Sequence, residues 1–150
     1  MNQENSYLNE IKELVIAELS NIDRLKDELK LYVNDAEARR AKGSILHDFY
    51  NICERIFKLI TKEVNGDFET GEHWHKQLLY RMTLELKDIR PAVISKDLAA
   101  SLDEFLMFRH LFRNIYGFEL LGDRLDRLVD KFFMTADRFK REIEDFIKLI

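Results

Sequence analysis

The sequence predicts an all-α fold, an up-and-down bundle of four to five helices that forms a single domain over residues 1–150. Turn-forming residues are scarce, because the 150 residues include only five glycines and one proline, whereas a β-rich fold needs more frequent turns. Apolar residues also recur at steps of three and four along most of the chain, which is the period of an amphipathic helix. The short loops between these stretches place neighbouring helices antiparallel.

Two helices are predicted in the first half of the chain. The first covers Ser6 to Tyr32, and its apolar positions form a single stripe. The second begins at Asn34-Asp35-Ala36, where polar side chains can cap free backbone N–H groups, and ends near Val64, before Asn65-Gly66. The apolar arc of this second helix consists of Ile45, Phe49, Ile52, Cys53, Ile56, Phe57 and Ile60.

Three further helices are predicted in the second half. One covers Glu72 to about Lys87 and ends before Pro91, because a residue that precedes proline is biased away from the helical conformation. The next begins at Ser95, a good capping residue, and stops at Gly117. The last begins near Asp123 and continues to the C-terminus.

Composition excludes several classes of protein. A net charge of −4 argues against binding nucleic acid through bulk positive charge, although a small local basic site remains compatible with it. The single cysteine, Cys53, allows neither a disulfide framework nor a zinc site built from cysteines. Without a secretory signal or a membrane-spanning apolar run, we expect a cytoplasmic protein with no membrane contact. We expect no cofactor and no metal, since the usual phosphate-loop and metal-carboxylate patterns are missing from the sequence.

The fourth predicted helix interrupts its own apolar face with polar residues. Arg109 projects into the middle of that face, Arg113 lies within it, and Tyr116 returns to nearly the same direction. His110 and Asn114, four residues apart, lie on the adjoining edge. The apolar face itself consists of Leu98, Leu102, Phe105, Leu106, Phe108, Phe112 and Ile115.

An arginine on an apolar face has two interpretations. The guanidinium group offers a planar fork of donors that matches phosphate oxygens, so the cluster from Arg109 to Tyr116 is a candidate phosphate site. Alternatively, Arg109 forms a structural ion pair with an acid on a neighbouring helix, for which Asp48 and Glu54 are the candidates.

The histidines around Trp74 are a weaker signal. His73 and His75 point about 200° apart on a helix, so they do not share a metal ion easily. We interpret both as surface residues that flank one buried tryptophan.

The stretch FRHLFRNIYGFEL, from Phe108 to Leu120, resembles the motif region of HepT-like proteins in the HEPN superfamily. The motif of that family is an arginine, four residues, a histidine, one residue and a tyrosine. Arg109 and Tyr116 match its arginine and tyrosine, whereas Asn114 stands at the histidine position. The segment GSILHDFYNICERIF, from Gly43 to Phe57, is similar to the region that precedes the motif.

This resemblance implies a homodimer in which motif helices from two subunits form a cleft that cuts RNA without a metal. Arg109 would bind the scissile phosphate with help from Arg113, and His110 or Asn114 would complete the catalytic site. The resemblance also implies a small nucleotidyltransferase as the antitoxin, which attaches AMP to Tyr116. The alternative is an inactive or weak HEPN domain that binds a nucleotide or the nucleotidyltransferase. In a third interpretation the chain is a purely structural bundle, and Arg109 then lies in a closed intramolecular ion pair.

Overall fold

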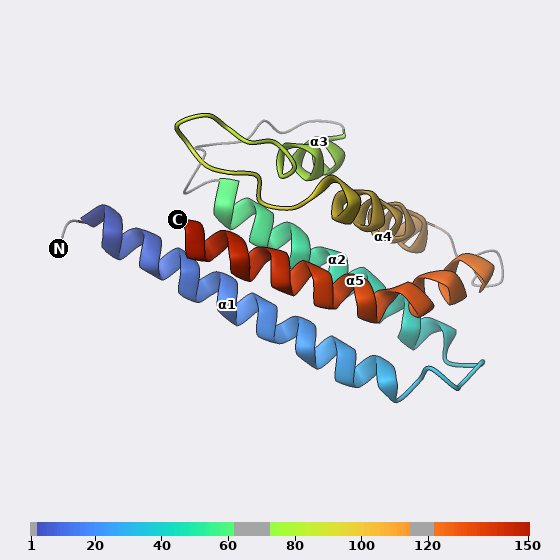
Figure 1. The fold of residues 1–150 in the computed structure, drawn as a ribbon. Helices are drawn as coiled ribbons and strands as arrows, with labels where there is room; N and C mark the ends of the chain where they lie inside the picture. The colour runs from blue at the N-terminus through green and yellow to red at the C-terminus, as the bar shows by residue number, and fades with distance from the viewer. Residues whose placement is uncertain (1–2, 62–72, 115–121) are drawn as a thin grey trace.

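The computed structural model describes residues 3–61, 73–114 and 122–150. Within these residues the chain forms five helices, α1 (Gln3–Lys30), α2 (Arg39–Ile60), α3 (Trp74–Arg81), α4 (Lys96–Asn114) and α5 (Gly122–Leu149). The four longer helices alternate in direction, and the start of α1 lies at the same end of the bundle as the end of α5 (Figure 1). Helix α2 contacts each of the other four helices. The predicted up-and-down helical bundle is therefore confirmed.

Aromatic side chains from three helices form the centre of the core. The ring of Phe49 on α2 makes edge-on contacts with Phe105 on α4 and with Phe132 and Phe139 on α5, at centroid distances of 5.2, 5.1 and 6.3 Å. All four side chains are fully buried. Edge-on pairs contribute about 0.5–1.5 kcal/mol beyond simple burial, so this cluster fixes how α2, α4 and α5 pack together.

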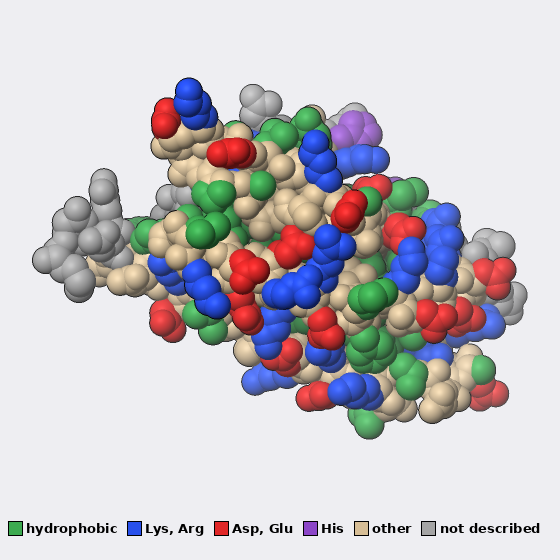
Figure 2. All heavy atoms as spheres, viewed as in Figure 1, with side chains coloured by type: hydrophobic (Ala, Val, Ile, Leu, Met, Phe, Trp, Pro, Cys, Tyr) green, Lys and Arg blue, Asp and Glu red, His purple; other side chains and the backbone are tan. Residues whose placement is uncertain are grey.

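The outer face of the bundle carries charges of both signs. Figure 2 shows acidic and basic side chains interspersed over the face on which α1 and α5 lie. Lys140 on α5 bonds Asp23 on α1 at 2.7 Å, and Lys26 on α1 pairs with Asp137 on α5. In the parts of the chain that the structure describes, no helix combines the length and apolar character needed to cross a bilayer.

The predicted boundaries of the first two helices need correction. Helix α1 covers Gln3–Lys30 and not Ser6 to Tyr32. Helix α2 begins at Arg39, later than expected, and the residue before it, Ala38, provides no side-chain cap. Asp35 instead accepts a hydrogen bond from the backbone N–H of Glu37 at 3.0 Å, so its side chain stabilises a turn in the loop. The expected end of this helix near Val64 lies outside the described residues.

The third helix is shorter than predicted, since α3 ends at Arg81 and not near Lys87. The buried guanidinium of Arg90 donates hydrogen bonds to the carbonyls of Arg81, Leu84 and Pro91 at 2.9–3.0 Å. Leu86 and Arg90 also pair through their backbones. Arg90 therefore satisfies carbonyls that a longer helix would have used internally, and the chain turns back towards α4.

The predicted start of the fourth helix is confirmed. The Ser95 hydroxyl accepts a hydrogen bond from the backbone N–H of Leu98 at 3.1 Å, as an N-terminal cap does. Glu142 on α5 accepts hydrogen bonds from both the N–H and the hydroxyl of Ser95. This contact fixes the start of α4 against α5. The expected stop at Gly117 lies outside the described residues, and α5 begins one residue before the predicted Asp123.

Candidate functional site

Arg109 lies inside the subunit and forms an ion pair with α2. Its two terminal nitrogens donate to the two carboxylate oxygens of Glu54, each at 3.3 Å, and Nη1 also donates to Oδ1 of Asn51 at 2.9 Å. The side chains of Arg109 and Glu54 are only 5% and 6% exposed. Of the two acids proposed from the sequence, Glu54 is the partner. Asp48 lies instead 3.7 Å from the ring of its neighbour His47.

His75 joins this ion pair from α3. Its Nδ1 lies 2.7 Å from Oε2 of Glu54 and 3.0 Å from Nη2 of Arg109. The carboxylate is the nearer group and can only accept a hydrogen bond, so Nδ1 carries the proton and donates it to Glu54. The interpretation of His75 as a surface residue is therefore wrong. Helix α3 contacts both α2 and α4, and this packing brings the side chain to their polar cluster.

Trp74 supports His75 from within the same helix. Their ring centroids are 3.7 Å apart, and the ammonium group of Lys58 on α2 lies 4.6 Å from the centroid of the tryptophan ring. Trp74 is half-buried rather than buried as predicted. The indole thus contacts both an imidazole and a cation, and the contact with the cation is favourable for its electron-rich face.

Arg109 also packs close to buried residues of α2. Its guanidinium carbon lies 4.9 Å from the centroid of the Tyr50 ring, and Tyr50 is fully buried. Burial raises the pKa of the Tyr50 phenol well above its ordinary value. Burial likewise raises the pKa of the Cys53 thiol, so this cysteine stays protonated and is a small apolar residue of the core.

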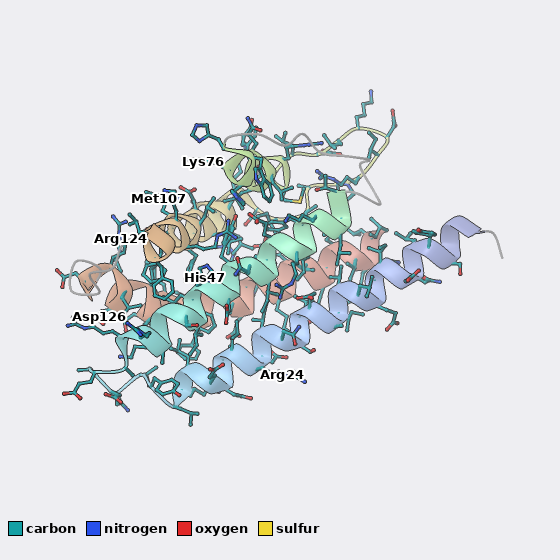
Figure 3. The ribbon with its side chains drawn as sticks, turned by 180° about the vertical axis from the view of Figure 1, so that it is seen from behind. Arg24, His47, Lys76, Met107, Arg124 and Asp126 are labelled. Carbon is teal, nitrogen blue, oxygen red and sulfur yellow. The ribbon has the colours of Figure 1, made fainter. Side chains whose placement is uncertain are left out.

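A cavity of about 670 Å³ opens beside Arg109, between α3, α4 and the start of α5. Figure 3 shows Lys76, Met107 and Arg124 on this side of the molecule, on α3, α4 and α5 respectively. Among the described residues that line this α3–α4 cavity, basic or imidazole side chains outnumber the single acid, Asp103. The lining consists of His73, Trp74, His75, Lys76, Asp103, Leu106, Met107, Arg109, His110, Leu111 and Arg124.

The structure brings two of the predicted site residues to one cavity. Arg109 reaches the α3–α4 cavity from a buried position, whereas His110 lines it with an exposed side chain. Arg113 and Asn114 form the end of α4, but their side chains lie outside the described part of the structure, as does all of Tyr116.

Sequence reasoning missed two members of the polar cluster around Arg109, namely Asn51 and His75. Asn51 precedes Glu54 by three residues, a spacing that places both on one face of a helix and could have indicated it. His75 has no such local signal. Among residues 3–61, 73–114 and 122–150, no group of three histidines, cysteines or acids is placed to hold a metal ion.

A sequence model of the family described as HepT-like protein matches residues 41–150. The chain belongs to the HepT-like family. Comparisons with curated proteins and with solved structures gave no match. The segment shared with HepT-like proteins starts within α2 and includes Glu54, His75 and Arg109, whereas α1 precedes it. The predicted membership of the HepT-like family is thereby confirmed.

Proposed function

We propose that this HepT-like protein is the toxin of a toxin–antitoxin module and cleaves RNA without a metal in the α3–α4 cavity. The observation that carries the proposal is that the motif arginine, Arg109, lines a cavity rich in basic and imidazole side chains. RNA phosphates bind to such groups, because lysine and arginine neutralise their charge. Since the net charge of the chain is −4, binding depends on this local cluster and not on the whole surface.

His110 is the proposed base for the cleavage reaction. An imidazole gains and loses protons near neutral pH, so His110 can take the proton of the ribose 2′-hydroxyl while that oxygen attacks the adjacent phosphate. An amide cannot transfer protons in this way, so Asn114 is limited to hydrogen bonds. Arg109 and Arg113 stabilise the negative charge that develops on the phosphate.

A second subunit completes the proposed cleft. The family resemblance implies a dimer in which the motif helices of two subunits meet, and in this chain those are the α4 helices. Met107 on α4 supports this arrangement, because it is a large apolar side chain that lines the cavity and is half-exposed in the single chain. A partner helix would remove such a side chain from water.

The test is cleavage of labelled RNA by the purified protein in EDTA. Replacement of His110 by alanine should lower the cleavage rate by about 100-fold or more, the usual contribution of a general base. Arg124 lines the cavity, whereas Arg127, on the same helix, is exposed and does not. Arg124→Ala should weaken RNA binding and Arg127→Ala should not. An inactive wild-type protein, or His110→Ala with full activity, would overturn the proposal.

A non-catalytic HEPN domain is the second candidate function. It is favoured by the geometry of Arg109, whose terminal nitrogens already bond Glu54 and Asn51, and by Asn114 at the histidine position of the motif. This domain would bind a nucleotide or a small nucleotidyltransferase through the same surface. Calorimetric titration with AMP measures nucleotide binding, and electrophoresis of RNA incubated with the protein separates the two functions, since only a ribonuclease converts bound RNA into shorter fragments.

The toxin–antitoxin assignment has a test of its own at Tyr116. The protein is mixed with ATP and a small nucleotidyltransferase encoded beside it, and the masses of peptides that contain Tyr116 are measured. We expect a gain equal to one AMP group, which Tyr116→Phe abolishes. An unchanged mass together with no complex would remove this assignment.

A further inference from the structure

His75 is an imidazole of the α3–α4 cavity that neighbouring side chains hold in one orientation. Glu54 bonds its Nδ1 at 2.7 Å, and Trp74 lies against its ring with centroids 3.7 Å apart. The side chain is nevertheless 35% exposed and lines the cavity. A surface histidine has no need of a buried carboxylate, since water satisfies its ring nitrogens equally well. The contact with Glu54 therefore selects one tautomer and one orientation.

The free ring position of His75 is Nε2. Among the described residues, the polar contacts of the ring lie at Nδ1, which donates to Glu54. Nη2 of Arg109 lies 3.0 Å from the same atom but is itself a donor, so it forms no hydrogen bond with the protonated Nδ1. Glu54 accepts the Nδ1 proton in the neutral ring and in the imidazolium, so protons enter and leave the ring at Nε2. The charged and titratable groups around His75 are Glu54 on α2, Lys76 on α3, Asp103, Arg109 and His110 on α4, and Arg124 on α5.

Cleavage of RNA by its own 2′-hydroxyl moves two protons. A bond forms between the 2′-oxygen and phosphorus, and the bond between phosphorus and the 5′-oxygen breaks. The base takes the proton of the 2′-hydroxyl, and an acid delivers another proton to the departing 5′-oxygen. The products are a 2′,3′-cyclic phosphate and a 5′-hydroxyl, so no water and no redox partner is consumed.

On the basis of the proposed ribonuclease function, we propose that His75, oriented by Glu54, is the general acid that protonates the departing 5′-oxygen. His110 and His75 then occupy the two proton-transfer roles in one cavity. Glu54 accepts the hydrogen bond from Nδ1, so Nε2 is the ring atom through which His75 donates a proton to the leaving oxygen. Because the attacking group is a 2′-hydroxyl, the substrate class is RNA and DNA is not cleaved.

A sulfur substitution at the leaving group tests this role directly. The cleavage position of the wild-type protein is first mapped on RNA. Two oligonucleotides are then made with a single ribonucleotide at that position, one with the normal 5′-oxygen and one with a bridging 5′-sulfur. A thiolate departs without a proton, so the sulfur substrate has no need of a general acid.

The critical variant is His75→Gln. We expect it to cleave the oxygen substrate about 100-fold or more slowly than the wild type and the sulfur substrate at nearly the wild-type rate. His110→Ala should lose both activities, because the base is needed in either case. Gln77→Ala is the matched control, since Gln77 is an exposed residue of the same helix that does not line the cavity. It should retain both activities.

Wild-type pH profiles give a second measurement that depends on no variant. As alkaline pH removes the proton of the acid, kcat/KM for the oxygen substrate should fall, whereas kcat/KM for the sulfur substrate should stay level. Two outcomes would overturn only the role proposed for His75 and leave the ribonuclease function standing. One is an equal loss of both activities in folded His75→Gln, and the other is full activity of this variant on the oxygen substrate. Failure of the wild-type protein to cleave any RNA would overturn the proposed function itself.

Discussion

Glu54 on α2 accepts hydrogen bonds from both terminal nitrogens of Arg109 on α4, and His75 donates to the same carboxylate. This carboxylate therefore joins three helices inside one subunit. Because Arg109 is also the motif arginine, the ion pair links the stability of the fold to the candidate site. An arginine fixed in this way is preorganised, since its guanidinium is already desolvated and oriented at the edge of the cavity.

Replacement of Glu54 by glutamine should destabilise the protein markedly. The substitution leaves the buried guanidinium of Arg109 without its countercharge. Removing one partner of a buried ion pair costs about 3–5 kcal/mol. Urea denaturation followed by circular dichroism measures the free energy of unfolding. Glu18, which pairs with Arg55 near the surface, is the matched control, and Glu18→Gln should cost less than about 1 kcal/mol. Equal effects of the two variants would contradict the structural importance of the buried pair.

Tyr50→Phe should be neutral or stabilising. Among the described residues, the buried hydroxyl of Tyr50 has no hydrogen-bond partner, and such a group costs about 1–3 kcal/mol of desolvation. The phenylalanine ring keeps the contact with the Arg109 guanidinium. A loss of more than about 2 kcal/mol in urea denaturation would show that the hydroxyl forms a bond that stabilises the fold.

The raised pKa of Tyr50 predicts that the stability of the fold decreases at alkaline pH. Because burial raises the folded-state pKa of Tyr50 above its ordinary value of 10.0, the phenol binds its proton more tightly in the folded protein than in the unfolded chain. The stabilisation that comes from this tighter proton binding is therefore complete below pH 10 and is lost as the pH rises further. Unfolding midpoints measured from pH 9 to 12 should fall less steeply for Tyr50→Phe than for the wild type.

Gly43→Ala should disturb the segment that carries the motif. A Cβ atom at this position would lie 2.6 Å from Cε2 of the Phe112 ring on α4, closer than two carbon atoms can approach. The clash should outweigh the gain of about 1 kcal/mol that alanine brings to a helix, because overpacking costs about 1–3 kcal/mol. Thermal denaturation is the measurement. Phe112→Leu should recover part of the loss in the double variant, and simple additivity would argue against direct contact.

Arg90→Ala should unfold the turn that follows α3. Three carbonyl groups lose their donor, and each unsatisfied buried acceptor costs about 1–3 kcal/mol. Arg90→Lys should restore only part of the stability, since an ammonium lacks the planar fork that reaches three carbonyls. Hydrogen exchange of the amides of Val93 and Ile94, which bond the Met82 carbonyl, reports on the turn. Unchanged exchange in Arg90→Ala would contradict this account.

The sequence determined the helical class, the order of the helices along the chain and the unusual position of Arg109 on an apolar face. These properties are local, because they depend on the spacing of residues within a single helix. Helix ends were predicted well where a local cap exists, as at Ser95. They were predicted poorly at the end of α3, where a residue nine positions away supplies the bonds.

Only the tertiary structure decided which residues meet Arg109. Asp48 and Glu54 lie on the same helix, and the way α4 packs against α2 selects the second. His75 reaches the pair across separations of 21 residues from Glu54 and 34 from Arg109. Periodicity tells which side of a helix is apolar, but it contains no information about the angle and register at which two helices cross. Those contacts depend on how the whole core packs, and a single stretch of sequence does not specify them.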